Sequence, residues 1–297
     1  MDLLFGKPVA ERILSDIKHG VGSGKPPVLA VYLIGDDPSS EIYARSKARK
    51  GEKIGIEVDL RRFPSDAGLD EILGSLDRDA SDINVHGVMI ERPLPEGMNI
   101  GSLTDRIPAF KDVEGLKPDN YGLMAMGTPR FIPPTPLGAI LLLLHYGIPL
   151  EGRTVVVVGR SPNVGRPLSI LLSQKKAYGN ASVVLLHSRS GDPSDWTSRA
   201  DIVITAVGRP KMLKGSMIRD GAVLIDLGIN PVGDGIVGDV DMESVGDVAS
   251  MATPTPGGTG PVTVAAMFLN LLRARDLQKG IKSSITDPLI RMIYEIA

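Results

Sequence analysis

Four consecutive valines at positions 155–158 constrain the fold most, because a turn bounded by Gly159 and Gly165 follows them directly. A run of β-branched residues predicts a strand buried on both faces, and a helical pattern follows the turn. Backbone N–H groups at the start of that helix favour an anion, and glycine lets a ligand approach the backbone. The stretch therefore predicts a phosphate-binding turn. A plain strand-turn-helix without a ligand stays open, since the glycines depart from the usual Gly-x-Gly-x-x-Gly spacing.

The residues before this stretch predict a small α/β unit with one capped helix. Asp37 reads as a helix cap with Pro38 at the first helical position. Between Pro108 and Pro136 periodicity is weak and glycine, proline and methionine are frequent, which indicates interdomain loops and a domain boundary. The helices predicted before this boundary cover residues 9–17, 38–54 and 69–76, and the predicted strands cover residues 28–34, 57–63 and 85–90.

After the boundary the sequence alternates strands and helices again, an order that builds a parallel sheet with helices on both faces. The predicted helices cover residues 137–146 and 164–175, and the predicted strands cover residues 155–158, 182–186, 202–206 and 223–227. Two last helices, one ending near residue 277 and one beginning near residue 288, are expected to return to the first domain. We therefore predict an α/β fold with two domains, formed by residues 1–118 with 264–297 and by residues 119–263.

Composition excludes several classes of partner and site. A net charge of -2 and a pI of about 6.1 provide no general attraction for nucleic acid or for an anionic membrane. The absence of cysteine excludes disulfides, thiolate catalysis and zinc–sulfur sites, and it fits a cytoplasmic protein. The four histidines are scattered, so no metal site is predicted. No signal peptide is expected at the start, and the apolar run 139–144 is far shorter than the ~20 residues of a membrane span.

Two groups of polar residues are candidates for chemistry. Tyr43 and Lys47 lie four residues apart and share one face of a predicted helix. A lysine on such a face is either exposed to solvent or, if it points into a cleft, suited to proton transfer. Its candidate partners are acids just past strand ends or in loops, namely Glu91, Asp112 and Glu114. The loop at 111–115 is either a solvated turn or a site where a carboxylate accepts two N–H bonds from a planar heterocycle.

The strand predicted at 182–186 ends in a basic segment that indicates the type of dinucleotide. An NAD site commonly has an acid here for the ribose hydroxyls, whereas this chain has Ser188 and Arg189. Together with Arg160 of the glycine turn, these residues could hold a ribose phosphate, which favours NADP over NAD; an exposed Arg189 without a ligand is the alternative.

Six segments together resemble the methylenetetrahydrofolate dehydrogenase/cyclohydrolase family of one-carbon metabolism, and they occur in the family's order along nearly the whole chain. The segments are residues 40–47 (SEIYARSK), 87–95 (GVMIERPLP), 111–115 (KDVEG), 133–136 (PPTP), 158–167 (VGRSPNVGRP) and 253–263 (TPTPGGTGPVT).

The resemblance implies a folate-binding catalytic domain (1–118 with 264–297), a Rossmann-type NADP domain (119–263) and a homodimer formed through the Rossmann domain. It implies NADP-dependent oxidation of 5,10-methylene-tetrahydrofolate to the methenyl form and hydrolysis to 10-formyl-tetrahydrofolate, which feeds purine biosynthesis. The implied catalytic residues are Lys47 and Tyr43, and Glu91 is a further catalytic candidate; the predicted substrate-binding residues are Tyr43, Glu114, Pro256, Gly257 and Gly258. The predicted cofactor site consists of Gly159, Arg160, Ser161, Val164, Gly165, Ser188, Arg189, Gly208 and Ile229.

Two positions depart from the family pattern. Glu114 replaces the usual aspartate, a change that a small retreat of the loop can absorb. Glu91 replaces the usual glutamine, and an ionised Glu91 within ~4–6 Å of Lys47 would favour the charged ammonium and oppose a neutral lysine base. Glu91 is then protonated or serves as the base itself. Two other functions stay open from the sequence: a shikimate-type NADP-dependent dehydrogenase, and a dinucleotide-binding homodimer without catalysis.

Overall fold

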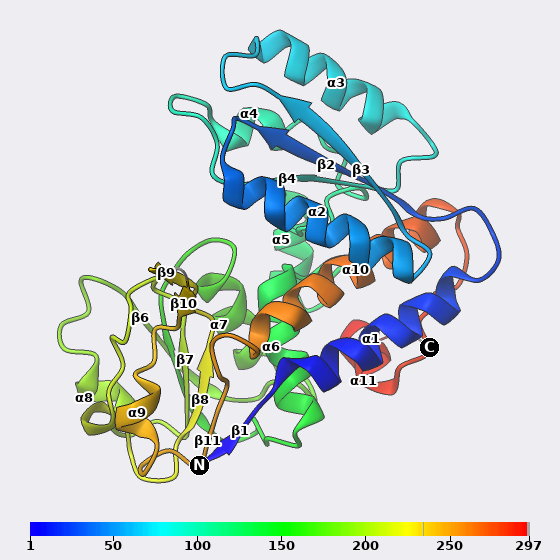
Figure 1. The fold of residues 1–297 in the computed structure, drawn as a ribbon. Helices are drawn as coiled ribbons and strands as arrows, with labels where there is room; N and C mark the ends of the chain where they lie inside the picture. The colour runs from blue at the N-terminus through cyan, green and yellow to red at the C-terminus, as the bar shows by residue number, and fades with distance from the viewer. Residues whose placement is uncertain (234, 296–297) are drawn as a thin grey trace.

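The computed structural model describes residues 1–233 and 235–295 and contains two separate parallel sheets with a layer of helices between them (Figure 1). The large sheet has the strand order β1-β11-β8-β7-β5-β6, and the small sheet has the order β3-β2-β4. The strands of these sheets are β1 (Asp2–Leu3), β2 (Val28–Ile34), β3 (Glu57–Phe63), β4 (Gly87–Ile90), β5 (Thr154–Val158), β6 (Ser182–Leu186), β7 (Ile202–Thr205), β8 (Val223–Asp226) and β11 (Met251–Ala252). A separate antiparallel hairpin joins β9 (Asn230–Val232) to β10 (Gly235–Val237).

The helices alternate with the strands along most of the chain, which confirms the predicted α/β class. They are α1 (Gly6–Val21), α2 (Pro38–Lys53), α3 (Leu69–Ser81), α4 (Ile100–Thr104), α5 (Pro118–Ala125), α6 (Pro134–His145), α7 (Gly165–Ser173), α8 (Ser194–Thr197), α9 (Met242–Val245), α10 (Thr259–Gln278) and α11 (Pro288–Tyr294). None of the described helices is both long and apolar enough to cross a membrane.

The small sheet is covered on both faces, by α2 on one side and by α3 on the other (Figure 1). Strand β2 lies in the middle and pairs in parallel with β3 and β4. Its residues alternate between two cores: Val31 belongs to the core that includes Ala44 of α2, and Tyr32 belongs to the core that includes Ile72 of α3. Helix α2 begins as predicted, because the Asp37 carboxylate accepts a hydrogen bond from the Ser40 N–H at 2.8 Å.

The four valines form the centre of the large sheet. Strand β5 pairs in parallel with β6 and with β7, and Val155, Val156, Val157 and Val158 are at most 3% exposed. This burial on both faces confirms the strand predicted from the sequence. The sheet also contains β1, where Leu3 pairs with Ala252; no strand was predicted at the start of the chain. Two residues are too few for a periodic pattern, so only the neighbouring strand reveals this one.

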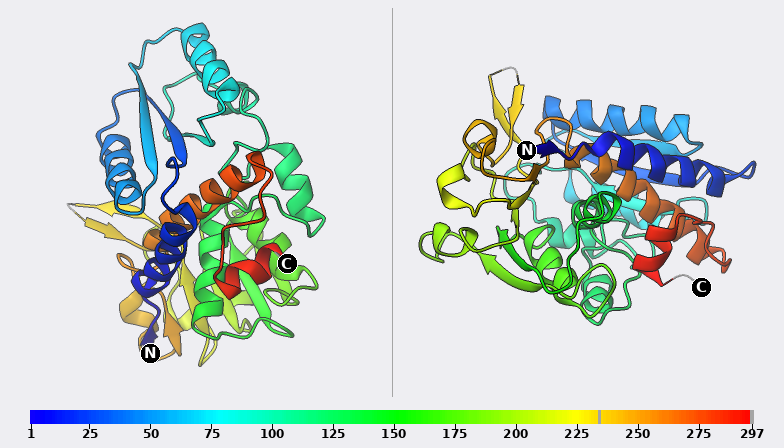
Figure 2. Two further views of the ribbon diagram at one scale, coloured as in Figure 1. Left: turned by 90° about the vertical axis from the view of Figure 1, so that its right-hand side faces the viewer. Right: turned by 90° about the horizontal axis from the view of Figure 1, so that it is seen from below.

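Helices α1, α6 and α10 pack together between the two sheets, and Figure 2 shows α1 (blue) and α10 (orange) side by side. Gly138 permits the close crossing of α6 and α10, because a Cβ there would lie 3.2 Å from the Thr263 nitrogen. The segment between Pro108 and Pro136, predicted as loops, also contains the helix α5. Its eight residues carry little apolar periodicity, and Pro118 at the helix start was the only local signal for it.

Candidate functional site

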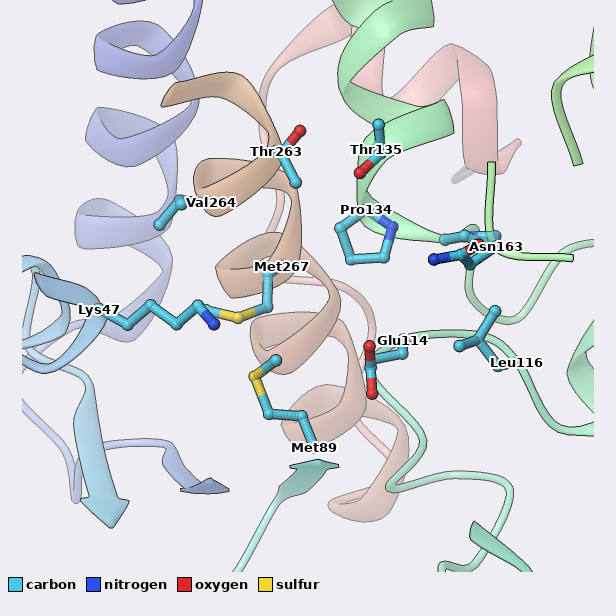
Figure 3. Close-up of a pocket in the computed structure, with 11 residues that line it drawn as sticks. Lys47, Met89, Glu114, Leu116, Pro134, Thr135, Asn163, Thr263, Val264 and Met267 are labelled. Atoms are coloured by element: carbon cyan, nitrogen blue, oxygen red, sulfur yellow. The ribbon is translucent and has the colours of Figure 1, made fainter. Parts of the chain in front are cut away.

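One pocket collects side chains from the small sheet and helix α2, from the helix layer and from the glycine turn after β5 (Figure 3). Its cavity volume is about 130 Å³. It is lined by Lys47, Met89, Glu114, Leu116, Pro133, Pro134, Thr135, Asn163, Thr263, Val264 and Met267. The pocket therefore lies between the small sheet and the glycine turn of the large sheet, where the carboxyl ends of parallel strands place ligands.

Lys47 and Glu91 form an ion pair at this pocket. The Lys47 Nζ donates to Glu91 Oε1 at 2.8 Å and to Oε2 at 2.5 Å, and the two side chains are only 13% and 12% exposed. Helix α2 presents the lysine, and Glu91 follows directly after β4, where its N–H donates to the Tyr32 carbonyl at 2.9 Å. The lysine thus points into the cleft and not into bulk solvent (Figure 3).

Glu114 points into the same pocket from the loop that follows β4 and α4 (Figure 3). Burial raises the pKa of Glu114 to about 7, with the charge of Arg92 opposing the shift and the carboxylates of Asp112 and Glu91 adding to it. At neutral pH this side chain therefore exchanges readily between an acceptor-only carboxylate and a neutral acid that also donates.

The loop that carries Glu114 is not a solvated turn, because its other charged residues are buried. Lys111 is 3% exposed and its Nζ donates to the carbonyls of Asp79 and Asp82 at 2.9 Å and 2.7 Å. Asp112 is 5% exposed and accepts from the Lys117 N–H and from Asn120 Nδ2. Asp112 is therefore engaged in holding the loop, and of the three predicted partner acids it is Glu91 that binds Lys47.

The other predicted substrate residues lie outside the lining of this pocket. Tyr43 is on α2 and is 49% exposed. Pro256 and Gly257 are exposed and Gly258 is buried, just before α10. This loop rests on the start of α1: the Gly6 N–H donates to the Gly257 carbonyl at 2.9 Å, and a Cβ on Gly6 would lie 1.8 Å from the Gly258 oxygen.

The glycine turn after β5 is packed as closely as a backbone allows. A Cβ on Gly159 would lie 2.3 Å from the Ala206 oxygen, and a Cβ on Gly165 would lie 1.8 Å from the Gly159 oxygen. Val164 is the N-cap of α7, and its side chain forms no hydrogen bond with the N–H groups of the helix. The turn therefore leaves backbone donors for an anion, which fits a dinucleotide phosphate. Its Asn163, not predicted from the sequence, reaches the pocket that holds Glu114.

The basic residues predicted to select NADP lie at the carboxyl edge of two neighbouring strands, β5 and β6. Arg160, Ser188 and Arg189 are all exposed, and Ser161 is partly exposed. Within residues 1–233 and 235–295, neither Arg160 nor Arg189 forms an ion pair. Both guanidinium groups are therefore available to a phosphate.

Two buried carboxylates support the loops with Gly208 and Ile229, and the sequence analysis missed both. Asp239 is fully buried and accepts from the N–H groups of Val207, Gly208 and Arg209 at 2.7, 3.2 and 2.8 Å. Asp226, at the end of β8, accepts from the N–H groups of Gly228 and Asp239, and burial raises its pKa. Gly208 and Ile229 themselves are exposed. An acid at a strand end was the only local signal for Asp226, and nothing local marked Asp239.

No group of three or more potential metal-ligating side chains occurs in the part of the chain that the structure describes.

Comparison with known proteins gives matches along nearly the whole chain. Residues 4–114 match the model of the tetrahydrofolate dehydrogenase/cyclohydrolase catalytic domain, and residues 133–279 match that of its NAD(P)-binding domain. The bifunctional protein FolD of Rhodopirellula baltica is 42% identical, with 93% of this chain and 97% of the relative covered. The crystal structure of the bifunctional 5,10-methylenetetrahydrofolate dehydrogenase/cyclohydrolase from Thermoplasma acidophilum is 38% identical, with a TM-score of 0.88 and coverage of 94% and 100%. The Trypanosoma brucei enzyme, solved with NADP cofactor and an inhibitor, is 28% identical, with a TM-score of 0.87 and coverage of 93% and 97%.

The shifted pKa of Glu114 predicts a pH-dependent change in stability. An acid with a raised pKa in the folded state binds more protons when folded, so the free energy of unfolding falls as pH rises from 4.5 to about 7. Glu114→Gln removes this term. As pH rises from 5 to 8, the free energy of unfolding of the variant, measured by urea denaturation, should increase by about 2 kcal/mol relative to that of wild type. Glu71→Gln, an exposed control on α3, should show no such trend, and a parallel dependence of wild type and Glu114→Gln would contradict the expected shift.

Proposed function

Because this chain belongs to the tetrahydrofolate dehydrogenase/cyclohydrolase family, we propose that its pocket carries out two consecutive reactions on one folate. The first is NADP-dependent oxidation of 5,10-methylene-tetrahydrofolate to 5,10-methenyl-tetrahydrofolate. The second is hydrolysis of that product to 10-formyl-tetrahydrofolate. The observation that carries the proposal is the one pocket that Lys47, Glu114 and Asn163 of the glycine turn line together.

The proposed cofactor site is the carboxyl edge of the large sheet. NADP supplies the hydride acceptor when it is bound. The close contact of Gly165 with Gly159 leaves the start of α7 open to the pyrophosphate, and Gly208 and Ile229 follow the neighbouring strands. Arg160, with Ser188 and Arg189, is proposed to hold the 2′-phosphate, since none of these side chains is buried.

The proposed substrate site is the pocket itself. The ionised form of Glu114 can accept two N–H bonds from the pterin, and Tyr43, Pro256, Gly257 and Gly258 are proposed to contact folate from the two rims. During hydrolysis a water adds to the methenyl carbon and loses a proton. The Lys47–Glu91 pair at the pocket is proposed to take up that proton, either through the carboxylate or through a lysine that has given up its own. The bond from this carbon to N5 then breaks, the hydroxyl proton passes to N5, and the hydroxyl oxygen becomes the formyl carbonyl oxygen.

We further propose a homodimer formed through the Rossmann-type domain, a cytoplasmic location and a supply of one-carbon units to purine biosynthesis, with no nucleic acid or membrane partner. The proposed domain limits are 1–118 with 264–297 for folate and 119–263 for NADP. The contacts of α10 with α1 and β4 support assigning the C-terminal helices to the folate part. A shikimate-type dehydrogenase and a non-catalytic dinucleotide-binding protein are both disfavoured, because models of the catalytic and the cofactor domain of one family match this chain.

A spectrophotometric assay tests the function directly. Purified protein given 5,10-methylene-tetrahydrofolate should form reduced nicotinamide, with kcat/KM for NADP at least about tenfold above that for NAD because two guanidinium groups face the 2′-phosphate. Turnover of shikimate in place of the folate, or cofactor binding with no turnover, would support one of the two alternatives.

Substitution of Lys47 separates the two reactions. Lys47→Met removes the ammonium but keeps most of the side-chain volume, so hydrolysis of the methenyl form should fall at least ~100-fold. The KM of the dehydrogenase reaction for the folate should stay within about threefold, because Glu114 is unchanged. Lys50→Met, on the same helix but outside the pocket, is the control and should hydrolyse normally. Wild-type hydrolysis by Lys47→Met would remove Lys47 from the mechanism.

Substitution of Glu91 tests the coupling in the ion pair. Glu91→Gln removes the carboxylate that pairs with Lys47, so the pH–rate profile for hydrolysis should differ from that of wild type. Glu96→Gln changes an exposed acid of the same loop and should leave the profile in place. Superimposable profiles for wild type and Glu91→Gln would show that Glu91 does not control the protonation of Lys47.

A further inference from the structure

Asn270 connects three chain segments that border the pocket. It is on α10, one turn beyond the pocket residue Met267, and it is fully buried. Its Nδ2 donates to the Val113 carbonyl at 2.7 Å and to the Ile132 carbonyl at 2.8 Å. The first carbonyl belongs to the peptide bond that leads into Glu114, and the second belongs to the peptide bond that leads into Pro133. Both donors of one amide are thus used on the two chain segments that border the pocket.

The amide can adopt only one orientation here. Its Oδ1 accepts a hydrogen bond from the Tyr294 hydroxyl at 2.8 Å, and that hydroxyl also accepts from the Ile132 N–H at 3.4 Å. A flipped amide would direct its oxygen at two carbonyl oxygens, which is unfavourable in a buried site. Its NH₂ group would then point at a hydroxyl that already accepts a hydrogen bond from the Ile132 N–H. Tyr294, on α11, therefore fixes which end of Asn270 points at the pocket segments.

Tyr294 is held in place by Arg273 of α10, the helix that also carries Asn270. It is 6% exposed, and the Arg273 guanidinium lies over its ring at 4.3 Å from the centroid. The Arg273 Nε donates to the Arg130 carbonyl at 2.7 Å, so the segment before α6 is tied to α10 a second time. Among the described residues, the C-terminal helix thus contributes to the geometry of the pocket without lining it.

We propose that Asn270, oriented by Tyr294, is a positioning residue that sets the distance between the Glu114 loop and the α6 entry, and thereby the affinity of the pocket for the folate head group. This inference rests on the proposed function for the identity of the ligand. Lys47 is on α2 and Glu91 directly follows β4, and the glycine turn connects β5 to α7. Neither the ion pair nor the glycine turn is therefore held by this amide. Loss of the amide should therefore weaken folate binding selectively.

Asn270→Asp is the decisive variant, because it preserves shape but replaces the two N–H donors with an acceptor that faces two carbonyls. The KM for 5,10-methylene-tetrahydrofolate should rise about tenfold, while the KM for NADP stays within about twofold. Tyr294→Phe removes only the orienting hydroxyl and should raise the folate KM about threefold. Thr197→Val, which removes the hydrogen bonds of another fully buried side chain to the Met217 and Pro193 carbonyls outside the pocket, is the control and should leave both KM values unchanged.

Hydrogen exchange provides a measurement that does not need turnover. In the substrate-free full-length protein, the amides of residues 113–117 and 130–132 should exchange faster in Asn270→Asp than in wild type, while the segment 155–158 keeps its protection. If Asn270→Asp fails to fold, Tyr294→Phe carries both measurements. A wild-type protein that forms no NADPH would overturn the proposed function, and the exchange data would still decide on Asn270. Unchanged exchange, equal losses for folate and NADP, or the same losses in Thr197→Val would overturn the positioning role.

Discussion

The close packing of α10 against α6 and α1 is the constraint on which the rest of the molecule depends. Gly138 lets α6 approach the backbone of α10 near Thr263, so both helices can border one pocket. The small sheet lies on one side of this layer and the large sheet on the other (Figure 1). Since parallel strands direct their carboxyl ends toward one edge, a fixed helix layer is sufficient to bring Lys47 from one unit and Asn163 from the other to a common ligand.

The charges of the pocket act as one coupled set. Lys47 is compensated by Glu91, and Glu91 in turn contributes to the raised pKa of Glu114. A glutamine at position 91 would leave the lysine uncompensated and would remove one of the charges that act on Glu114. The glutamate therefore affects two groups at once, the lysine proposed for proton transfer and the glutamate proposed to bind the pterin. With Glu114 ionised these three side chains carry a net charge of minus one, and with Glu114 protonated they are neutral, so the pocket changes its charge close to neutral pH.

Local pattern was sufficient for most of the fold and for part of the site. The strands at 28–34, 57–63 and 182–186 were predicted with the bounds that the structure shows, because each is a compact apolar or alternating run between turn signals. Glu91 was predicted as one of three candidate acids for Lys47, since a strand end and a helix face define their positions, and the structure shows that it is the one that binds. Asn270 and Asp239 could not be found this way. The carbonyls that Asn270 binds lie 157 and 138 residues away, and a single polar residue in a helix gives no indication of such partners.

The two loops predicted to contact ligands are both held by backbone contacts that leave no room for a side chain. Gly165 contacts the Gly159 carbonyl in the glycine turn, and Gly6 contacts the Gly258 carbonyl in the loop before α10. Because backbone contacts hold these loops, the side chains of Ser161 and Pro256 are not needed to keep the loops in place. A Cβ at Gly165 or Gly6, however, would displace the backbone itself. The start of α1 is therefore packed against the loop before α10, although β1, just before it, pairs with β11 of the large sheet.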